Sequence, residues 1–180
     1  MRSALGFAVL LYVALGIAGI TWMSLRGDDL GARTIGGGGW TPIAAGLGFA
    51  LAVLLVSDLL LERFEWTRLL RREVLAAFAP LTPATAVTLA VLSGVGEELF
   101  FRGALQPAIG WVASAVVFGA LHTSFDRQLA GWTLFATVVG FGLGGLFHVT
   151  GSVLAPAIAH TVINGVQLTR LATTRRERVD

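Results

Sequence analysis

The sequence predicts an all-α fold, a polytopic transmembrane helix bundle of about six spans plus an interfacial amphipathic helix. Composition is the first reason. Of the 180 residues, 55% are hydrophobic and only 13% are charged, and the mean hydropathy of +0.77 is too high for a water-soluble globule. The second reason is that the apolar residues gather in runs of roughly 20, the length of a membrane-spanning helix. A chain of this length then has no room for a separate soluble module.

Each expected span is an apolar run bounded by polar or helix-breaking residues. The first run is too long for a signal peptide and lacks a small-residue cleavage site before Arg26, so we expect a retained span. Four consecutive glycines then favour a loop, and the second span begins with an interfacial Trp40 and a first-turn Pro42. Pro80 and Pro83 mark the entry to the third span. The expected spans cover residues 4–25, 40–61, 82–106, 107–123, 129–147 and 152–171.

The segment between the second and third spans has a different pattern. From Glu62 to Phe78, arginine and glutamate interleave with large apolar residues such as Trp66 and Leu70, which predicts an amphipathic helix at the membrane surface. The fifth span is rich in glycine, which allows helices to approach closely in lipid. We divide the chain into an N-terminal transmembrane hairpin with its interfacial helix (1–81), a core that carries the motifs described below (82–171) and a basic tail (172–180).

The basic residues set the expected membrane orientation. All 13 are arginine, against 11 acidic residues, so the net charge is only +2 although the pI is near 10.4. Four arginines fall within residues 62–73 and four near the C-terminus, against two between the first spans, which predicts cytoplasmic termini. The exclusive use of arginine indicates a GC-rich genome, and the expected location is the cytoplasmic membrane of a prokaryote. Arginines placed between apolar segments anchor a protein in the lipid bilayer, and we expect no nucleic-acid partner.

Two adjacent glutamates lie inside the third expected span, where ionisable side chains are costly and usually do chemistry. Glu98 and Arg102 are four residues apart and share a helix face, so they can pair and lower the cost of burying each other. Glu97 points about 100° away and lacks that partner. Packing alone does not need a second carboxylate, so Glu97 is the candidate that takes a proton from water.

Two later spans carry the other candidate residues. In the fourth, His122 follows Phe118 by one turn, so the aromatic ring can pack beside the imidazole. In the sixth, His160 and Asn164 are also one turn apart, and two neighbouring donors on one rigid face suit the binding of an oxyanion. A carboxylate, an imidazole and a donor pair together indicate a site for water attack on a carbonyl.

Each of these residues also has a structural interpretation. Taken alone, His122 could equally be a helix-packing residue, and Asn164 would be a hydrogen bond between helices. Arg102 is more readily a partner of the neighbouring carboxylate, or a helix-end anchor, than a catalytic group. His148 at the end of the fifth span and Asp58 near the end of the second are expected at the membrane interface.

The candidate residues form three short motifs on successive apolar helices. These read Glu97-Glu98-x-x-x-Arg102, Phe118-x-x-x-His122 and His160-x-x-x-Asn164. Together they resemble the CPBP intramembrane proteases, a family that includes the CAAX prenyl protease 2 enzymes, bacterial Abi-type proteins and lysostaphin-resistance-like proteins. Each motif alone is weak, but all three occur in the order and with the internal spacings of the family, across roughly residues 82–171.

The resemblance implies an intramembrane endopeptidase in which Glu97, assisted by His122, is the general base. The pair His160 and Asn164 would then bind the oxyanion of the tetrahedral intermediate. The residues that the resemblance assigns to supporting this machinery are Glu98, Arg102 and Phe118.

We expect a metal-free mechanism without a cofactor. The alternative is a zinc-dependent metalloendopeptidase, whose ligands would be Glu97, His122 and His160 from three separate spans. The sequence has no His-Glu-x-x-His helix to favour this alternative. It also has no cysteine, so disulfides and thiolate metal sites are excluded.

The expected activity is hydrolysis of a peptide bond in a membrane-associated or lipidated protein or peptide. The resemblance implies CAAX processing in eukaryotic relatives, whereas a leader peptide or bacteriocin precursor is the better candidate substrate in a prokaryote. A non-proteolytic family member, acting as a membrane scaffold or bacteriocin self-immunity protein, is the main alternative. A proton-coupled transporter is a third and weaker one, because six short spans show no duplicated half.

Overall fold

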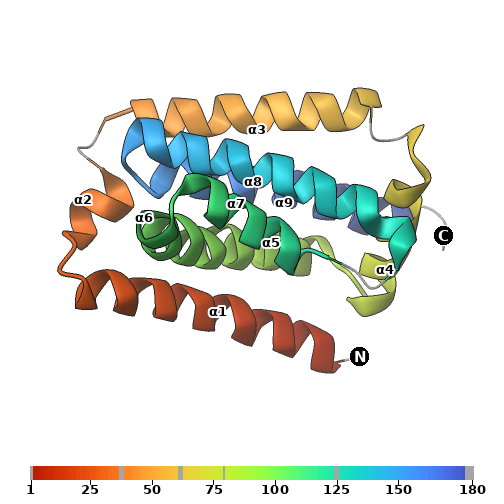
Figure 1. Ribbon diagram of the computed structural model, residues 1–180. Coiled ribbons are helices and arrows are strands. Elements are labelled where there is room, and N and C mark those ends of the chain that lie inside the picture. Colours follow the sequence, from red (N-terminus) through yellow and green to blue (C-terminus); the bar gives the residue numbers. More distant parts are fainter. Residues whose placement is uncertain (1, 37–38, 61–62, 79, 124–125, 177–180) are drawn as a thin grey trace.

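The computed structural model describes residues 2–36, 39–60, 63–78, 80–123 and 126–176, and every element within these ranges is a helix (Figure 1). The predicted all-α bundle is therefore confirmed. The expected basic tail continues the last helix to Arg176, and residues 177–180 lie outside the described ranges. The elements are α1 (Arg2–Leu25), α2 (Leu30–Ile35), α3 (Thr41–Leu60), α4 (Glu65–Ala77), α5 (Pro83–Glu98), the π-helical segment η2 (Leu99–Leu105), α6 (Gln106–Ile109), α7 (Trp111–Leu121), the 3-10 turn η3 (Arg127–Leu129), α8 (Ala130–Thr150) and α9 (Leu154–Arg176).

The long helices lie side by side along one common axis (Figure 1). α1 begins and α9 ends at the same end of the bundle, where the amphipathic helix α4 also lies, and α2 and α6 lie at the opposite end. The arginine-rich helix α4 and the C-terminal end of α9 therefore share one end of the molecule. This is the arrangement expected when both arginine-rich segments face the same side of a membrane.

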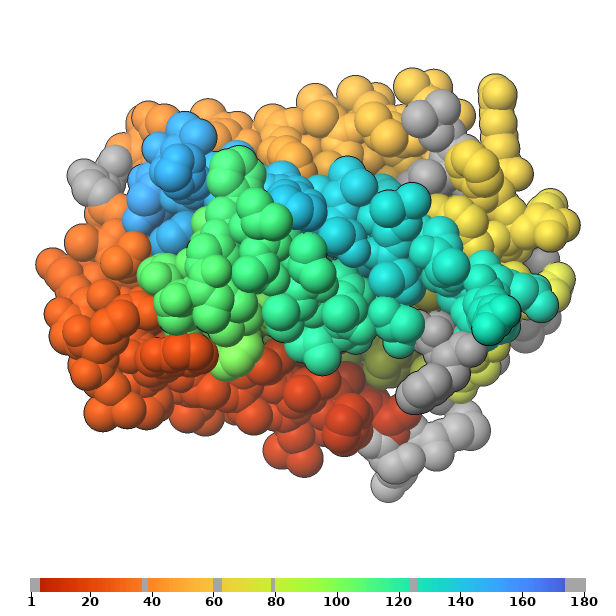
Figure 2. Space-filling model, in the orientation of Figure 1, coloured from red at the N-terminus to blue at the C-terminus, as the bar shows by residue number. Residues whose placement is uncertain are grey.

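Large apolar side chains cover the outer faces of the bundle. Phe7 and Leu10 on α1 and Leu59 on α3 are each about two-thirds exposed, and Figure 2 shows one outer face, where α1, α7 and α8 lie next to one another. Such a surface requires lipid rather than water, so the chain is an integral membrane protein. The described helices that are long and apolar enough to cross a membrane are Ala4–Leu25, Thr41–Leu59, Pro83–Ile109 and Arg127–Thr150.

The predicted fourth span, residues 107–123, is wrong at its start and in its length. Pro107 belongs to the preceding helical stretch, which continues from Pro83 to Ile109, and the chain turns only at Gly110, whose φ of 90° favours glycine. α7 then has 11 residues, or roughly 16 Å, about half the thickness of a bilayer core. It therefore ends part of the way along the bundle, and the partly buried His122 directly follows it.

The last helix, α9, is long but more polar than the four membrane-crossing stretches, because it lies in the middle of the bundle. It has 23 residues, and none from Leu154 to Thr169 is exposed. A helix covered by other helices does not need an apolar surface if its polar side chains find partners there. Two of the motif residues, His160 and Asn164, lie on this covered stretch.

The predicted loop between the first two spans contains a short helix that the sequence analysis missed. The side chain of Asp29 caps α2 by accepting a hydrogen bond from the Ala32 amide at 3.0 Å. Ser152, just before α9, donates its hydroxyl to the carbonyl of Thr34 at 3.0 Å. α2 is therefore fixed against the turn that joins α8 to α9.

Two glycines allow the motif helix α5 to pack tightly between its neighbours. A Cβ on Gly96 would overlap the carbonyl oxygen of Tyr12 on α1, and a Cβ on Gly94 would overlap Thr161 on α9. Small residues at such positions let membrane helices approach closely and gain van der Waals contact. The close contact with α9 brings the two glutamates of α5 within reach of the histidine on that helix.

Candidate active site

The two motif glutamates are in the last turn of α5 and are both buried. Glu98 is 0% exposed and Glu97 is 7% exposed. Adjacent residues on a helix point about 100° apart, so the two carboxylates have different surroundings.

Glu98 is the centre of a buried hydrogen-bonded network. Arg102 donates from Nη1 to Glu98 Oε1 at 2.9 Å, and His160 donates from Nδ1 to the same oxygen at 2.8 Å. The second terminal nitrogen of Arg102, Nη2, donates to the carbonyl of Gly140 on α8 at 2.9 Å. The expected contact between Glu98 and Arg102 is thus present, whereas the sequence did not identify His160 as a second partner. The network joins α5, η2, α8 and α9.

Glu97 instead faces His122, which directly follows α7. The distance from Glu97 Oε2 to His122 Nε2 is 3.9 Å, too long for a direct hydrogen bond. Glu97 Oε2 is buried and has no hydrogen-bond partner in the described part of the chain. The His122 side chain is 23% exposed, against 9% for that of Glu97. The pair is therefore more accessible from the side of His122 than from the side of Glu97.

The other nitrogen of His122 fixes the direction of the ring. Nδ1 lies 2.7 Å from the carbonyl oxygen of Phe118, and since a carbonyl can only accept, Nδ1 carries the proton and donates. In the neutral ring Nε2 is therefore an unprotonated acceptor. His122 thus turns a lone pair toward the carboxylate of Glu97.

Phe118 connects the two halves of the site. Its ring centre lies 4.4 Å from that of His122, and the guanidinium carbon of Arg102 lies 4.5 Å from the same ring centre. The ring is almost completely buried and also packs edge to face against Phe101 of η2, at 5.0 Å. The predicted packing of Phe118 beside His122 is thus present, and Phe118 has an additional contact with Arg102.

The two polar residues of α9 bind different partners on α5. His160 donates to Glu98, as described above, and Asn164 donates from Nδ2 to the hydroxyl oxygen of Ser93 at 3.0 Å. These two bonds do not use Nε2 of His160 or the second hydrogen on Nδ2 of Asn164. Ser93 is buried and lies one turn before Glu97, a position that the sequence analysis overlooked although a serine in an apolar helix was a usable signal.

The zinc alternative does not fit this arrangement. In the described residues, no three histidine or carboxylate side chains come together in a way that could hold a metal ion. Glu97 lies near His122, whereas His160 directs Nδ1 to Glu98. The described residues therefore give a zinc site no support, and the metal-free mechanism stays a prediction.

Two polar residues that the sequence placed at the interface lie away from the site. His148 stacks on Trp111 with ring centres 5.5 Å apart. Asp58 accepts a hydrogen bond from Arg170 at 2.6 Å, and both side chains are about half exposed. Neither contact involves the motif residues.

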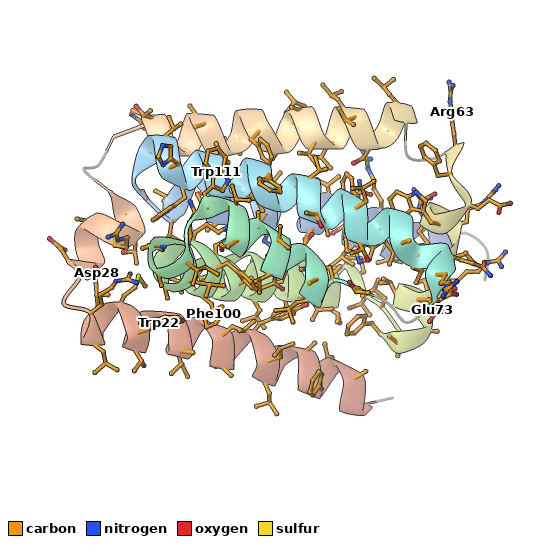
Figure 3. The ribbon with its side chains drawn as sticks, viewed as in Figure 1. Trp22, Asp28, Arg63, Glu73, Phe100 and Trp111 are labelled. Carbon is orange, nitrogen blue, oxygen red and sulfur yellow. The ribbon has the colours of Figure 1, made fainter. Side chains whose placement is uncertain are left out.

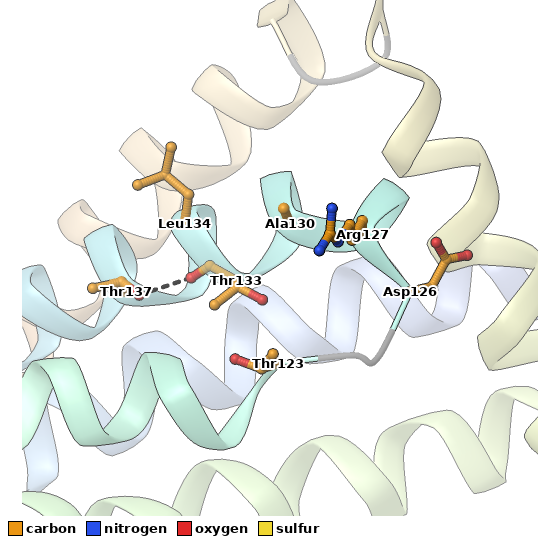
Figure 4. Close-up of a pocket in the computed structure, with 7 residues that line it drawn as sticks. All are labelled: Thr123, Asp126, Arg127, Ala130, Thr133, Leu134 and Thr137. Carbon is orange, nitrogen blue, oxygen red and sulfur yellow. Dashed lines mark hydrogen bonds between the residues drawn. The ribbon is translucent and has the colours of Figure 1, made fainter.

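A groove of about 460 Å³ begins at the residue after His122 (Figure 4). It lies between the end of α7 and the start of α8, and Figure 4 shows the hydroxyl of Thr137 bonded to the carbonyl of Thr133, at 2.7 Å. The hydroxyl oxygen of Thr133 is buried without a hydrogen-bond partner among the described residues. The lining residues are Thr123, Asp126, Arg127, Ala130, Thr133, Leu134 and Thr137.

A family of known proteins matches the part of the chain that holds the candidate residues. Residues 79–166 match the family model of the Rce1-like proteins, described as type II CAAX prenyl endopeptidase Rce1-like. This segment holds α5, η2, α7, α8 and the motif part of α9, and the match confirms the family resemblance predicted from the three motifs.

One curated relative shares part of this segment. The uncharacterized protein YpbD of Bacillus subtilis (strain 168) is 38% identical over 82 residues, which cover 44% of this chain and 42% of YpbD. The chain thus spans less than half of the length of that relative. No solved structure matches this chain.

Proposed function

We propose that the protein is an intramembrane endopeptidase, a proposal supported by the match of residues 79–166 to the Rce1-like family of type II CAAX prenyl endopeptidases. In this proposal it hydrolyses a peptide bond of a membrane-associated protein or peptide, with Glu97 as the general base. The observation that carries the proposal is the facing pair of Glu97 and His122 inside an apolar bundle.

The attacking water binds between these two side chains. Glu97 Oε2 and His122 Nε2 are both acceptors, and they face each other at 3.9 Å. Two acceptors do not bond each other, but one water molecule can donate a hydrogen to each, and a gap beyond 3.5 Å is where a bridging water is expected. Both hydrogens of that water are then engaged, and its oxygen lone pairs are free to attack a carbonyl carbon.

Hydrolysis follows as two proton transfers. Glu97 takes one proton from the water as the oxygen bonds to the peptide carbonyl carbon, which gives a tetrahedral intermediate with a negative oxygen. His160 Nε2–H, in the ring protonated on both nitrogens, and the second amide hydrogen of Asn164 donate to this oxygen. Glu97 then returns the proton to the departing amide nitrogen, the carbon–nitrogen bond breaks, and a carboxyl and an amine are the products.

Glu98, Arg102 and Phe118 hold the reacting groups in place. Arg102 and His160 both donate to Glu98 Oε1, so this carboxylate fixes the direction of the His160 ring. Phe118 packs against the ring of His122 and against Arg102. None of the three needs to contact the substrate, because each acts through a neighbour.

The substrate class that we propose is a membrane-associated or lipidated peptide, processed in the manner of CAAX proteins, leader peptides or bacteriocin precursors. The groove beside Thr123 is the proposed way in, since it starts next to His122, the more exposed member of the pair. Its mixture of hydroxyl groups and apolar carbon suits an extended peptide backbone. We further propose a prokaryotic cytoplasmic membrane with both termini on the cytoplasmic side, the side that the arginine distribution favours.

The test compares membrane proteomes of cells that contain the unchanged protein, Glu97→Gln or Glu73→Gln. Glu73 is an exposed carboxylate on α4, so it is the matched control for loss of one acidic charge. We expect uncleaved precursors to accumulate only with Glu97→Gln, with all three proteins present at equal level. If Glu97→Gln leaves every precursor processed, or preserves the cellular phenotype, the protein is a scaffold or self-immunity protein and the proposed activity is wrong.

A further inference from the structure

The helix that carries the motif glutamates changes its form directly after them. α5 is α-helical to Glu98, and the seven residues Leu99–Leu105 form the π-helical segment η2. The amide of Gln106 donates to the carbonyl of Phe101, five residues earlier, as a π-helix requires. π-helical turns are rare and occur frequently at functional sites. Arg102, which holds Glu98, lies in the middle of this segment.

The sequence leaves one carbonyl of this segment without its ordinary helical donor. Where η2 meets the α-helical form of α6, the amide of residue 107 would ordinarily donate to a carbonyl four or five residues earlier, that of Gly103 or of Arg102. Residue 107 is proline, which has no N–H. A buried carbonyl in this position needs a donor from elsewhere.

Arg26 supplies that donor from a distant part of the chain. Its Nη2 donates to the carbonyl of Gly103 at 2.9 Å, and its Nη1 donates to the carbonyl of Ala104 at 2.9 Å. Arg26 lies just after α1, 77 and 78 residues away from these two partners. The two bonds hold the planar guanidinium against the carbonyls of Gly103 and Ala104 near the end of η2.

Arg26 is itself held in this position. Asp28 accepts hydrogen bonds from Nε and Nη2 of Arg26 and also pairs with Arg33 at 3.6 Å. One turn before Arg26, the fully buried Met23 packs where a Cβ on Gly103 would otherwise lie. Figure 3 shows Trp22 of the same turn close to Phe100 of η2, and their ring centres are 6.2 Å apart. The C-terminal end of α1 therefore packs against η2 through several contacts.

We propose that Arg26 is a positioning residue for hydrolysis. It sets the register of η2, and thereby the direction of Arg102 and Glu98, by replacing the backbone donor that Pro107 lacks. The inference rests on the proposed function, because the register matters to the reaction only if these residues support catalysis. Arg26 touches neither the substrate nor the reacting water.

The test uses the full-length protein in liposomes, with Arg26→Gln, Arg26→Lys and the control Arg68→Gln. Arg68 has the same charge but is exposed on α4, where it pairs with Glu65. Two measurements are made for each protein. One is kcat and KM for a precursor found in the Glu97→Gln comparison, and the other is hydrogen exchange of the backbone amides of residues 99–109.

We expect Arg26→Gln to lower kcat by about tenfold to a hundredfold with KM unchanged, because a displacement of about 1 Å at the supporting residues has effects of this size. Exchange should become faster in residues 99–109 and stay unchanged in α8. Arg26→Lys, which keeps one donor for the carbonyls, should recover part of the rate, and Arg68→Gln should behave as the unchanged protein. If Arg26→Gln does not fold, the test is the kcat of Arg26→Lys, which should show a smaller loss.

Two outcomes contradict different claims. If the unchanged protein cleaves its precursor and Arg26→Gln has the same kcat, or loses activity only through KM, Arg26 does not position the site. If the unchanged protein cleaves no peptide at all while Arg26→Gln still alters the exchange of residues 99–109, the proposed function fails, and Arg26 has only a structural role.

Discussion

The guanidinium carbon of Arg102 lies 4.5 Å from the ring centre of Phe118, and both side chains are almost completely buried. The ring therefore lies against a cation on one side and against His122 on another, with its centre 4.4 Å from that of the histidine ring. A buried contact between a cation and an aromatic face is stabilising, and it orients both partners. Through this ring, the Glu98 network and the Glu97–His122 pair are in physical contact.

Phe118→Ala should destabilise the protein by about 3–5 kcal/mol, as expected for loss of a buried phenylalanine. It should also lower the cleavage rate, because His122 loses the surface that fixes its ring. Phe118→Leu keeps most of the apolar volume but removes the aromatic face, so it should retain more stability than Phe118→Ala while losing much of the activity. Unfolding in mixed micelles and the cleavage rate of each variant are the measurements. Equal activity of Phe118→Leu and the unchanged protein would show that the aromatic face has no role.

Arg102→Met should cost about 3–5 kcal/mol of stability, because it leaves the carboxylate of Glu98 buried without its cation. Glu98→Gln removes that charge, so the double variant should be more stable than Arg102→Met alone. The free energies of unfolding of the two single variants and the double variant form a thermodynamic cycle. Additive losses would mean that the two side chains do not interact.

The ion pair of Asp28 with Arg26 should persist through the neutral and mildly acidic range. The hydrogen bond from Arg26 is the main cause that holds the pKa of Asp28 below its ordinary value of 3.8. A pKa lowered by folding stabilises the folded state above the unfolded-state pKa, and this contribution is lost as the pH falls through the folded-state pKa. We therefore expect the stability difference between the unchanged protein and Asp28→Asn to be constant from pH 8 to pH 5 and to shrink below about pH 4. A difference that disappears already at pH 6 would contradict this.

Cleavage should survive removal of metal ions. The described residues hold no gathered set of three histidine or carboxylate ligands, and His160 is bonded to Glu98 through Nδ1. Dialysis of the liposome-bound protein against a strong chelator should leave kcat unchanged. Loss of activity that zinc alone restores would establish the metal-dependent alternative.

The sequence was sufficient to predict the fold class and the pairing of Glu98 with Arg102, because both depend on local patterns. Apolar runs predict membrane helices, and a spacing of four residues places two side chains on one helix face. The contact of His160 with Glu98 spans 62 residues and depends on how closely α9 packs against Gly94, which local spacing does not encode. The bond between Asn164 and Ser93 depends on the same packing, although a serine in an apolar helix is a visible signal for a polar partner.

The errors in the sequence analysis also have physical causes. The π-helical segment η2 has the same apolar character as an α-helix, and the only local signal for its end was Pro107. Gly110, with its positive φ, marks the true start of the fourth span, whereas Pro107, the predicted boundary, lies inside the preceding helical stretch. α9 is less apolar than a lipid-facing helix because its neighbours cover it, and composition cannot show which helix is central.

The most direct test of the central claim is a kinetic double-mutant cycle on Glu97 and His122. Glu97→Gln, His122→Ala and the double variant are compared by kcat on one precursor, with His148→Ala as the histidine control outside the site. If the two side chains hold one water molecule together, the double variant is no slower than the slower single variant, because removing either partner already loses that water. Losses that multiply in the double variant would show that Glu97 and His122 act independently and would contradict the account.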